Sequence, residues 1–156
     1  MAEEEQPAGN GEQKIVRVQK VFLKDVSFET PNSPEIFLQE WKPDMNLEIE
    51  SRARVLNDDL HEVVLTLTAT AKVSDKTAYL AEVHQSGIFL MQGLEDAELQ
   101  RLHNVYCLRT LYPYGAAALS ELVLKGGFPS LLPAPVNFDA LYQQRLQASQ
   151  QAQEAG

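Results

Sequence analysis

The chain has 156 residues, of which 44% are apolar and 22% are charged, and its formal net charge is −9. This length and composition predict one globular domain that buries a substantial core. The negative charge argues against binding to nucleic acid or to anionic membrane surfaces, because both depend on clustered lysine and arginine.

The first residues are rich in Glu, Gln and Gly, so we expect residues 1–13 to form a disordered acidic segment. They lack the basic and apolar regions of a signal peptide, and no apolar run reaches the ~18 residues of a membrane span. Cys107 is the single cysteine, which excludes an intrachain disulfide. These features predict a soluble intracellular protein.

Four runs of alternating apolar and polar residues follow, as is typical of strands with one buried face. The first covers residues 16–28 and is sparsely apolar in its middle. The others cover residues 45–55, 63–73 and 77–91. Asn57-Asp58-Asp59 and Ser74-Asp75-Lys76 supply turn residues between the later runs. The pattern predicts a four-stranded antiparallel β-meander with one apolar face.

The segment between the first two strands combines aromatic rings with carboxylates. Residues 30–34 end the first strand, because their two prolines cannot donate to a β-ladder. Asn32 or Ser33 is predicted to cap a short helix that carries Ile36, Phe37 and Trp41 on one side. Apolar rings beside acidic groups, without a reactive side chain, indicate a binding surface.

Helical spacing begins after Glu95 and Asp96, and this long helix ends at Gly126-Gly127, with a break or kink expected at Pro113. Its part over residues 116–124 is apolar around most of its circumference. It is therefore either buried in its own subunit or covered by a second subunit, and we favour oligomerisation.

Asn137 is predicted to cap a C-terminal helix, and residues 147–156 to form a flexible Gln/Ala-rich tail. Residues 14–146 thus make a single α+β domain, with helices covering one sheet face.

The sequence contains no recognisable catalytic or metal-binding set. His61, His84 and His103 lack a second ligand at metal-binding spacing, and Cys107 is expected to be a small apolar core residue. No nucleophile elbow and no phosphate-binding glycine loop occur. We therefore predict a protein that is not an enzyme and has no metal or cofactor.

Six segments, in order between residues 15 and 146, resemble one known family: Lys24-Asp25-Val26-Ser27-Phe28-Glu29, Pro31-Asn32-Ser33-Pro34, Trp41, Gly87-Ile88-Phe89, Tyr112-Pro113-Tyr114 and Pro133-Ala134-Pro135-Val136-Asn137-Phe138-Asp139-Ala140-Leu141. The family is SecB, the bacterial protein-export chaperone. The resemblance implies a cytoplasmic, ATP-independent chaperone that keeps precursor proteins unfolded and delivers them to the SecA motor. It also implies a homotetramer, a dimer of dimers whose long helices lie between two eight-stranded sheets.

The resemblance also implies roles for individual residues. The acidic docking face for SecA falls on Asp25, Glu29, Leu80 and Glu82, and the strand positions at subunit contacts fall on Ala81, Val83 and Gln85. Client binding is expected at Phe28, Phe37 and Trp41, with Leu119 and Leu122 as further candidates. For Phe28 a place in the core is an equal alternative. The strand alternation predicts that Asp25, Ser27 and Glu29 face one way and Val26 and Phe28 the other.

Two other functions stay open. A SecB-like chaperone dedicated to an antitoxin or another single client would share the same scaffold. A thioesterase-like α+β enzyme is the third possibility, although the sequence offers no convergent acid, base or nucleophile.

Overall fold

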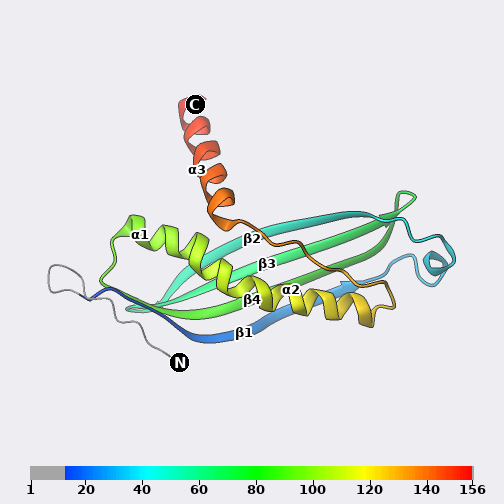
Figure 1. Ribbon diagram of the computed structural model, residues 1–156, viewed down its shortest axis with the longest axis horizontal. Coiled ribbons are helices and arrows are strands. Elements are labelled where there is room, and N and C mark those ends of the chain that lie inside the picture. Colours follow the sequence, from blue (N-terminus) through cyan, green and yellow to red (C-terminus); the bar gives the residue numbers. More distant parts are fainter. Residues whose placement is uncertain (1–12, 156) are drawn as a thin grey trace.

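Four long strands form one twisted antiparallel sheet in the computed structural model, which describes residues 13–155 (Figure 1). The strands are β1 (Ile15–Glu29), β2 (Asp44–Asn57), β3 (Leu60–Val73) and β4 (Lys76–Gln92). Their order across the sheet is β1-β4-β3-β2, so the predicted four-stranded antiparallel sheet is confirmed. The order differs from a simple meander, because β1 pairs with β4 and not with β2.

The connections explain this strand order. Asp58 and Asp59 join β2 to β3, and Ser74 and Asp75 join β3 to β4, so these strands form tight hairpins. Asp58, Ser74 and Asp75 have positive φ angles, a conformation that Asp tolerates in such turns. Residues 30–43 are too long for a hairpin and carry the chain from one sheet edge to the other.

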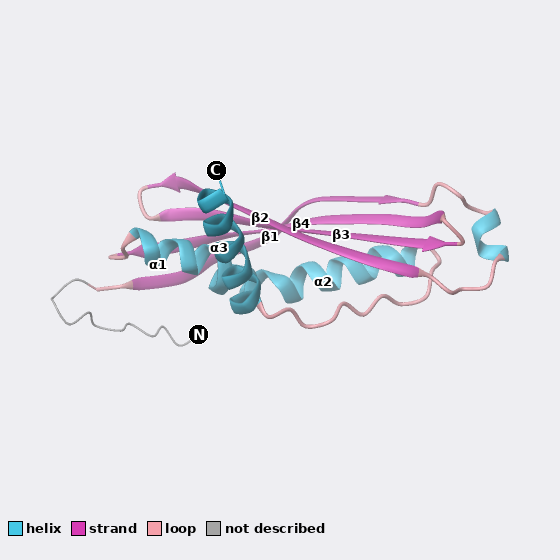
Figure 2. Cartoon of the chain, turned by 90° about the horizontal axis from the view of Figure 1, so that it is seen from above, coloured by secondary structure: helices cyan, strands magenta, loops and turns pink. Residues whose placement is uncertain are grey.

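The two faces of the sheet differ in polarity. We call "helix face" the side that carries Leu65, Leu67, Val83 and Phe89, all fully buried beneath the helices. We call "outer face" the opposite side, where Thr66, Thr68 and His84 lie. Figure 2 shows that the long helix covers the sheet on one side only. Side chains directly opposite each other on paired strands share a face, so the register assigns every strand residue.

β1 contains two register shifts, between Val18 and Lys20 and between Leu23 and Asp25. Each extra residue reverses the side on which the following residues point. Val21 and Leu23 therefore share the helix face, opposite Gly87 and Gln85. The prediction of one continuous alternation with a sparsely apolar middle is wrong for this reason: Lys20 and Phe22 lie on the outer face.

The helical part consists of α1 (Asp96–Arg101), the π-helical segment η2 (Leu102–Tyr106) and α2 (Cys107–Lys125). A capping box between Glu95 and Glu98 starts α1. The predicted break at Pro113 is not found, since α2 continues through this residue, which lies on its exposed side. The change in hydrogen bonding occurs instead at η2.

α2 packs on β3 and β4 through residues spaced four apart, namely Leu111, Gly115, Leu119 and Val123. Gly115 permits this close approach, because a Cβ atom there would lie 3.2 Å from Leu67 Cδ1 and 3.3 Å from Gln85 Cβ. The opposite side of α2 exposes Tyr114 and Leu124, so the helix keeps an uncovered apolar side in the single chain.

The chain after α2 turns at Gly127, whose φ of +88° is typical of a helix end. It then runs back along α2, where Ser120 donates to Leu131 O and Tyr112 to Ala134 O. The predicted cap of α3 (Phe138–Ala155) is confirmed, because Asn137 Oδ1 accepts a hydrogen bond from Ala140 N at 3.1 Å.

α3 projects away from the length of the sheet (Figure 1), but Arg145 in its middle donates to Ile49 O of β2 at 2.9 Å. Both Arg101 and Arg109 bind Asp139 at its start. The helix continues to Ala155, through the residues expected to form a flexible tail, so their flexibility stays a prediction. The predicted disordered segment, apart from Gln13, lies outside the described residues.

Candidate binding surfaces

Six carboxylates gather on the outer face, over the end of the sheet nearest the β3–β4 turn. We call this region the "acidic half"; its carboxylates belong to Asp25, Glu29, Asp44, Glu48, Glu50 and Glu82. Ser27 lies opposite Glu82, and Glu29 lies opposite Leu80, an apolar side chain that is 37% exposed. Thr68 donates a hydrogen bond of 3.1 Å to Glu82, and His84 Nε2 lies 3.8 Å from the same carboxylate oxygen.

The structure therefore brings together the four residues that the resemblance suggested for SecA docking. Asp25 and Glu29 come from β1, while Leu80 and Glu82 come from β4, the neighbouring strand. The predicted division of β1 is also found, since Val26 and Phe28 pair with helix-face residues of β4. Asp25 and Glu29 are exposed, so their charges are available to a partner.

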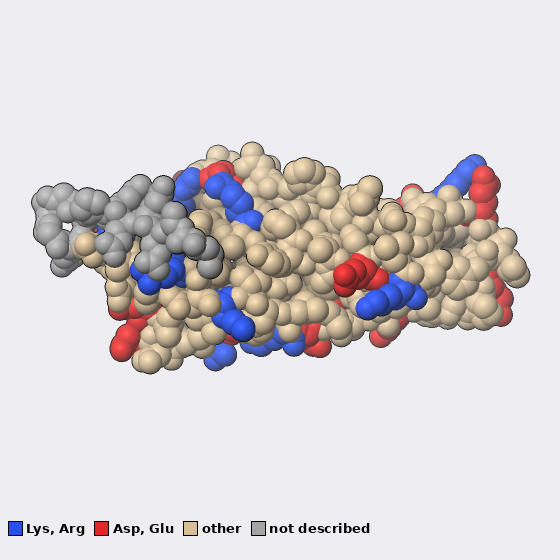
Figure 3. All heavy atoms as spheres, turned by 60° about the horizontal axis from the view of Figure 1, so that its bottom comes forward, with Lys and Arg blue, Asp and Glu red and all other residues tan. Residues whose placement is uncertain are grey.

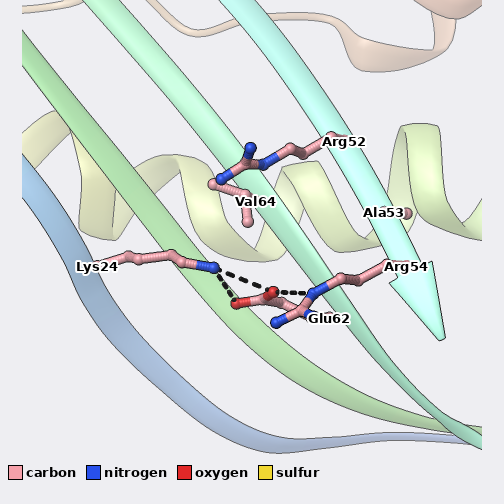
Figure 4. A pocket seen from close by; sticks show the side chains of 6 residues that line it. All are labelled: Lys24, Arg52, Ala53, Arg54, Glu62 and Val64. Atoms are coloured by element: carbon pink, nitrogen blue, oxygen red, sulfur yellow. Dashed lines mark hydrogen bonds and ion pairs between the residues drawn. The ribbon is translucent and has the colours of Figure 1, made fainter. Parts of the chain in front are cut away.

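The other half of the outer face has the opposite charge, a feature that sequence reasoning missed. We call it the "basic half"; its cations belong to Arg17, Lys20, Lys24, Arg52 and Arg54. A pocket of about 210 Å³ lies among Lys24, Arg52, Arg54, Glu62 and Val64 (Figure 4). The bulges in β1 conceal the charge pattern in the sequence, because they alone bring Lys20 and Lys24 to this face.

Glu62 is the one carboxylate of the basic half, and it is buried although it lies on the outer face. It accepts hydrogen bonds from Lys24 Nζ at 2.9 Å, Arg54 Nε at 2.8 Å and Ser86 Oγ at 2.8 Å. Burial alone raises its pKa, but the bonds from Arg54, Lys24 and Ser86 outweigh burial and lower the pKa to about 2. Glu62 is therefore ionised at neutral pH.

Five aromatic rings form a cluster on the helix-face side, at the end of α2. The "aromatic cluster" consists of Phe28, Phe37, Trp41, Tyr79 and Phe128. Phe128 lies at its centre, with ring centroids 4.8 Å from Phe37, 5.0 Å from Tyr79 and 5.5 Å from Trp41. Gly126 allows the contact, because a Cβ atom there would lie 2.2 Å from Phe28 Cζ.

The crossover segment supplies the exposed part of this cluster. Its short 3₁₀ helix η1 (Glu35–Leu38) exposes 47% of Phe37 and 88% of Leu38. The predicted cap is wrong: Asn32 donates instead to Thr77 O and Ser33 to Thr30 O, which fixes the crossover against β4 and its own turn. Trp41 lies beyond η1 and packs on Tyr79, whereas Ile36 is buried.

The structure separates the five candidate client-binding residues. Phe28, Phe37 and Trp41 meet in the aromatic cluster, with Phe28 and Trp41 partly buried. Leu122 is partly buried beside the core, and Leu119 is fully buried beneath α2 and offers no surface. Leu119 is therefore corrected from a contact residue to a core residue. Sequence reasoning missed Tyr79 and Phe128 as partners, although Phe128 directly follows the helix stop.

Charged side chains are sparse over much of the surface drawn in Figure 3. Figure 3 turns the lower edge of Figure 1 toward the viewer and shows a long surface of uncharged residues, interrupted in its middle by a small charged group. Such a surface favours contact with apolar segments of another chain.

The residues expected at subunit contacts have a different position. Ala81, Val83 and Gln85 all lie on the helix face of β4 and are buried by this chain's own α2. Their side chains therefore offer almost no exposed surface in the single chain, and their role at subunit contacts stays a prediction.

The remaining titratable groups form no catalytic arrangement in the described residues. His103 Nε2 lies 3.0 Å from His61 Nδ1, a pair that the sequence did not reveal, and burial lowers the pKa of both. Burial raises the pKa of the Cys107 thiol, as expected for a core cysteine. Residues 13–155 contain no group of three or more side chains suited to a metal ion.

Comparisons with known proteins agree on one family. The family described as preprotein translocase subunit SecB matches residues 9–149. The protein-export protein SecB of Nitrosococcus oceani is 49% identical over 95% of this chain and 92% of its own length. That of Ectopseudomonas mendocina is 50% identical over 88% of this chain and 86% of its own.

A solved structure has the same fold. It is a SecB-like chaperone of Mycobacterium tuberculosis in complex with a peptide from an antitoxin, with a TM-score of 0.66 and 16% sequence identity. The match covers 78% of this chain and 91% of that one. No helix in the described part of this chain is long and apolar enough to cross a membrane.

Proposed function

Because this chain belongs to the SecB family and is a chaperone of protein export, we propose that it binds unfolded precursor proteins and delivers them to SecA. The observation that carries this proposal is the arrangement of two adjacent residues of β1. Phe28 points into the aromatic cluster on the helix-face side, and Glu29 points into the acidic half on the outer face. One strand thus contributes to two surfaces, which a client and a motor protein can occupy at the same time.

The aromatic cluster suits an unfolded client. Phe37 and Leu38 are exposed, and Phe37 stacks on Phe128, which is itself packed, so the apolar surface keeps its shape without a client. Burying apolar side chains of a client there gains about 25 cal/mol per Å² and requires no particular sequence. Such a surface selects chains with exposed apolar segments, which a folded protein lacks.

The acidic half suits SecA. Glu29 lies opposite the exposed Leu80 and Glu82 lies two residues from it on β4, with Asp25 further along β1, which gives an apolar contact beside a row of negative charges. Rim charges of this kind orient a basic partner and speed its association more than they raise affinity individually. This arrangement supports docking of a basic region of SecA on β1 and β4.

Assembly into a tetramer is supported by the uncovered side of α2. Tyr114 and Leu124 are each more than half exposed in the single chain, next to Pro113 and Ala117, which are also exposed. Covering this side with a second copy buries an apolar helix surface, as expected of a dimer of dimers with its helices in the interface. Ala81, Val83 and Gln85 then contribute by setting the position of α2.

The proposed capture and delivery of clients requires neither a catalysed reaction nor a bound nucleotide. Capture depends on burial of apolar surface, and release depends on transfer to SecA, so neither step needs a reaction at this chain. We accordingly place the protein in the cytoplasm, where precursors are made. Dedication to a single antitoxin-type client has less support, since the relatives of about half identity are named for protein export.

Refolding of a precursor tests the proposal directly. A denatured precursor is diluted into buffer with and without the full chain, and its folding is followed by intrinsic fluorescence. We expect the chain to slow folding, and SecA to bind the resulting complex and accept the precursor, without added ATP at this stage. Unchanged folding, or a complex that SecA does not bind, would contradict the proposed function.

A further inference from the structure

The basic half of the outer face is a surface that the chaperone function leaves unexplained. The chain as a whole carries a net charge of −9, yet this region combines five cations with one carboxylate. The nearby acidic half has the opposite charge on the same face. Uneven charge of this kind produces a local field that attracts carboxylates and is screened by salt.

Two cations of the basic half are held in defined positions by ion pairs. Glu62 holds Lys24 and Arg54 in fixed positions through its two oxygens, while both cations stay partly open to solvent. Arg54 uses only its Nε atom in this contact. Arg52 lies beside them over Val64, and within residues 13–155 no hydrogen bond or ion pair holds its guanidinium (Figure 4). The pocket therefore presents the guanidinium of Arg54, held by Glu62, beside that of Arg52, and both offer N–H donors suited to carboxylates.

The same chain contains an acidic segment of suitable length next to this region. Glu3, Glu4 and Glu5 lie eight to ten residues before Gln13, where the described chain begins. That distance corresponds to about 26–33 Å of extended chain. The row that contains Lys20 and Arg54 lies about 23 Å along the strands from Gln13 and at most about 14 Å across them. The two distances combine to at most about 27 Å, so an extended segment can bring the glutamate side chains to the Lys20–Arg54 edge of the pocket.

We propose that the acidic N-terminal segment of this chain, through Glu3, Glu4 and Glu5, docks on the basic half of its own outer face. Each exposed ion pair contributes little alone, but the tether gives the segment a high effective concentration at the surface. Three carboxylates offset most of the positive charge of the basic half. The docked segment thereby leaves the basic half nearly neutral, so that the field of the acidic half dominates the outer face and strengthens long-range attraction of a basic partner.

Paramagnetic broadening of methyl signals tests this docking in the full chain. A spin label is attached to an Ala2→Cys variant; the native Cys107 is buried, and a Cys107→Ser background controls for its labelling. The reporters are Val64 and Ile88 in the basic half, Leu80 in the acidic half and Ile49 on the helix face. We expect the Val64 and Ile88 signals to lose most of their intensity at low salt, while Leu80 and Ile49 keep theirs.

Two further measurements show whether the broadening depends on the three glutamates and whether it arises within one chain. Replacing all three glutamates by glutamine (Glu3→Gln, Glu4→Gln, Glu5→Gln) keeps the length of the segment, and we expect it, like high salt, to restore the Val64 and Ile88 signals. Mixed samples, with the spin label and the isotope on different subunits, separate docking within a chain from docking on a neighbour. Equal broadening of Leu80, broadening that survives the glutamine changes, or broadening only in mixed samples would overturn the proposal.

Discussion

At the scale of single residues, Glu62 connects all four strands. It lies on β3 and binds Lys24 of β1, Arg54 of β2 and Ser86 of β4 within 2.9 Å. β1 and β2 are the two edge strands of the sheet in the single chain. One buried carboxylate on a central strand therefore links both edges. A buried charge is costly unless it is fully bonded, and these partners meet that requirement.

Replacing Glu62 by Gln is expected to lower the free energy of unfolding at pH 7 by about 2 kcal/mol, because the charge-assisted bonds are lost. The pKa of Glu62 is about 2 in the folded chain and 4.5 ordinarily. Its contribution is therefore complete above pH 4.5 and is lost as the pH falls toward 2. Urea unfolding of both proteins should show a stability difference that narrows over this interval.

Glu50→Gln provides the matched control for that prediction. Glu50 lies on the same face but is exposed, so its replacement should change stability by less than about 0.5 kcal/mol. A stability difference between wild type and Glu62→Gln that stays constant down to pH 2 would show that the carboxylate charge is unimportant.

At the scale of secondary-structure elements, the crossover and the end of α2 together build the aromatic cluster. Phe37 stacks on Phe128 with a centroid distance of 4.8 Å and keeps 47% of its surface exposed. Phe128 is held by the helix end, where Gly126 leaves room for Phe28. The rigid rings beneath Phe37 preorganise the apolar surface, which lowers the entropy cost of binding a client.

Phe37→Ala is expected to weaken binding of an unfolded precursor roughly tenfold, the equivalent of about 1.4 kcal/mol of lost apolar burial. Stability should change little, because the ring is already half exposed. Titration of a fluorescent unfolded precursor measures the affinity. Val55→Ala removes an exposed apolar side chain at the far end of β2 and serves as the control. Equal losses in both variants would show that the site is not specific to the cluster.

The sequence alone predicts which segments form strands and helices better than it predicts the sheet face on which each strand residue lies. The four alternating runs, the tight turns at Asp58 and Ser74 and the Asn137 cap are all found, since each depends on local chemistry. The bulges of β1 were missed, because the gain from packing Val21 on the core and the cost of burying Lys20 depend on α2 and β4. The strand order and the basic half depend on the same long-range packing.

The candidate site could be predicted only in part for a similar reason. The resemblance supplied Asp25, Glu29, Leu80 and Glu82, and the register places them on one face. Periodicity could not distinguish Leu119 from Leu122, because a helix with apolar residues on most sides does not reveal which side is covered. Phe128 and Tyr79 needed the three-dimensional fold, which brings the helix end beside β4.

At the scale of the whole molecule, the sheet separates the proposed partners. Clients are expected on the side of the aromatic cluster, SecA on the outer face and further copies of the chain on α2. The sheet lies between the SecA surface and the other two (Figure 2), whereas the client and assembly surfaces are neighbours on the helix side, at the end and along the length of α2. Changes at the SecA surface should therefore leave the other two intact, unless they move α2.

Ala81→Leu should weaken the proposed tetramer, although we do not place Ala81 in its interface. Ala81 is fully buried beneath α2, so a larger side chain there costs about 1–3 kcal/mol and displaces the helix. Sedimentation velocity at several concentrations should show smaller species than the wild type. Leu80→Ala, one residue away on the outer face, should leave the assembly unchanged. A normal tetramer in the Ala81→Leu variant would refute the indirect role given to this residue.

The most direct test of separate surfaces is the affinity for SecA of the double variant Asp25→Lys, Glu82→Lys. The variant Asp44→Lys, Glu50→Lys makes the same charge change at the opposite sheet edge, on β2, and is the control. Calorimetry should show that the first variant loses SecA binding by a factor of ten or more (about 1.4 kcal/mol) and the control by far less. Precursor binding and molecular mass should be unchanged in both. Equal losses in the two variants, or an unchanged affinity of the first, would contradict docking of SecA on β1 and β4.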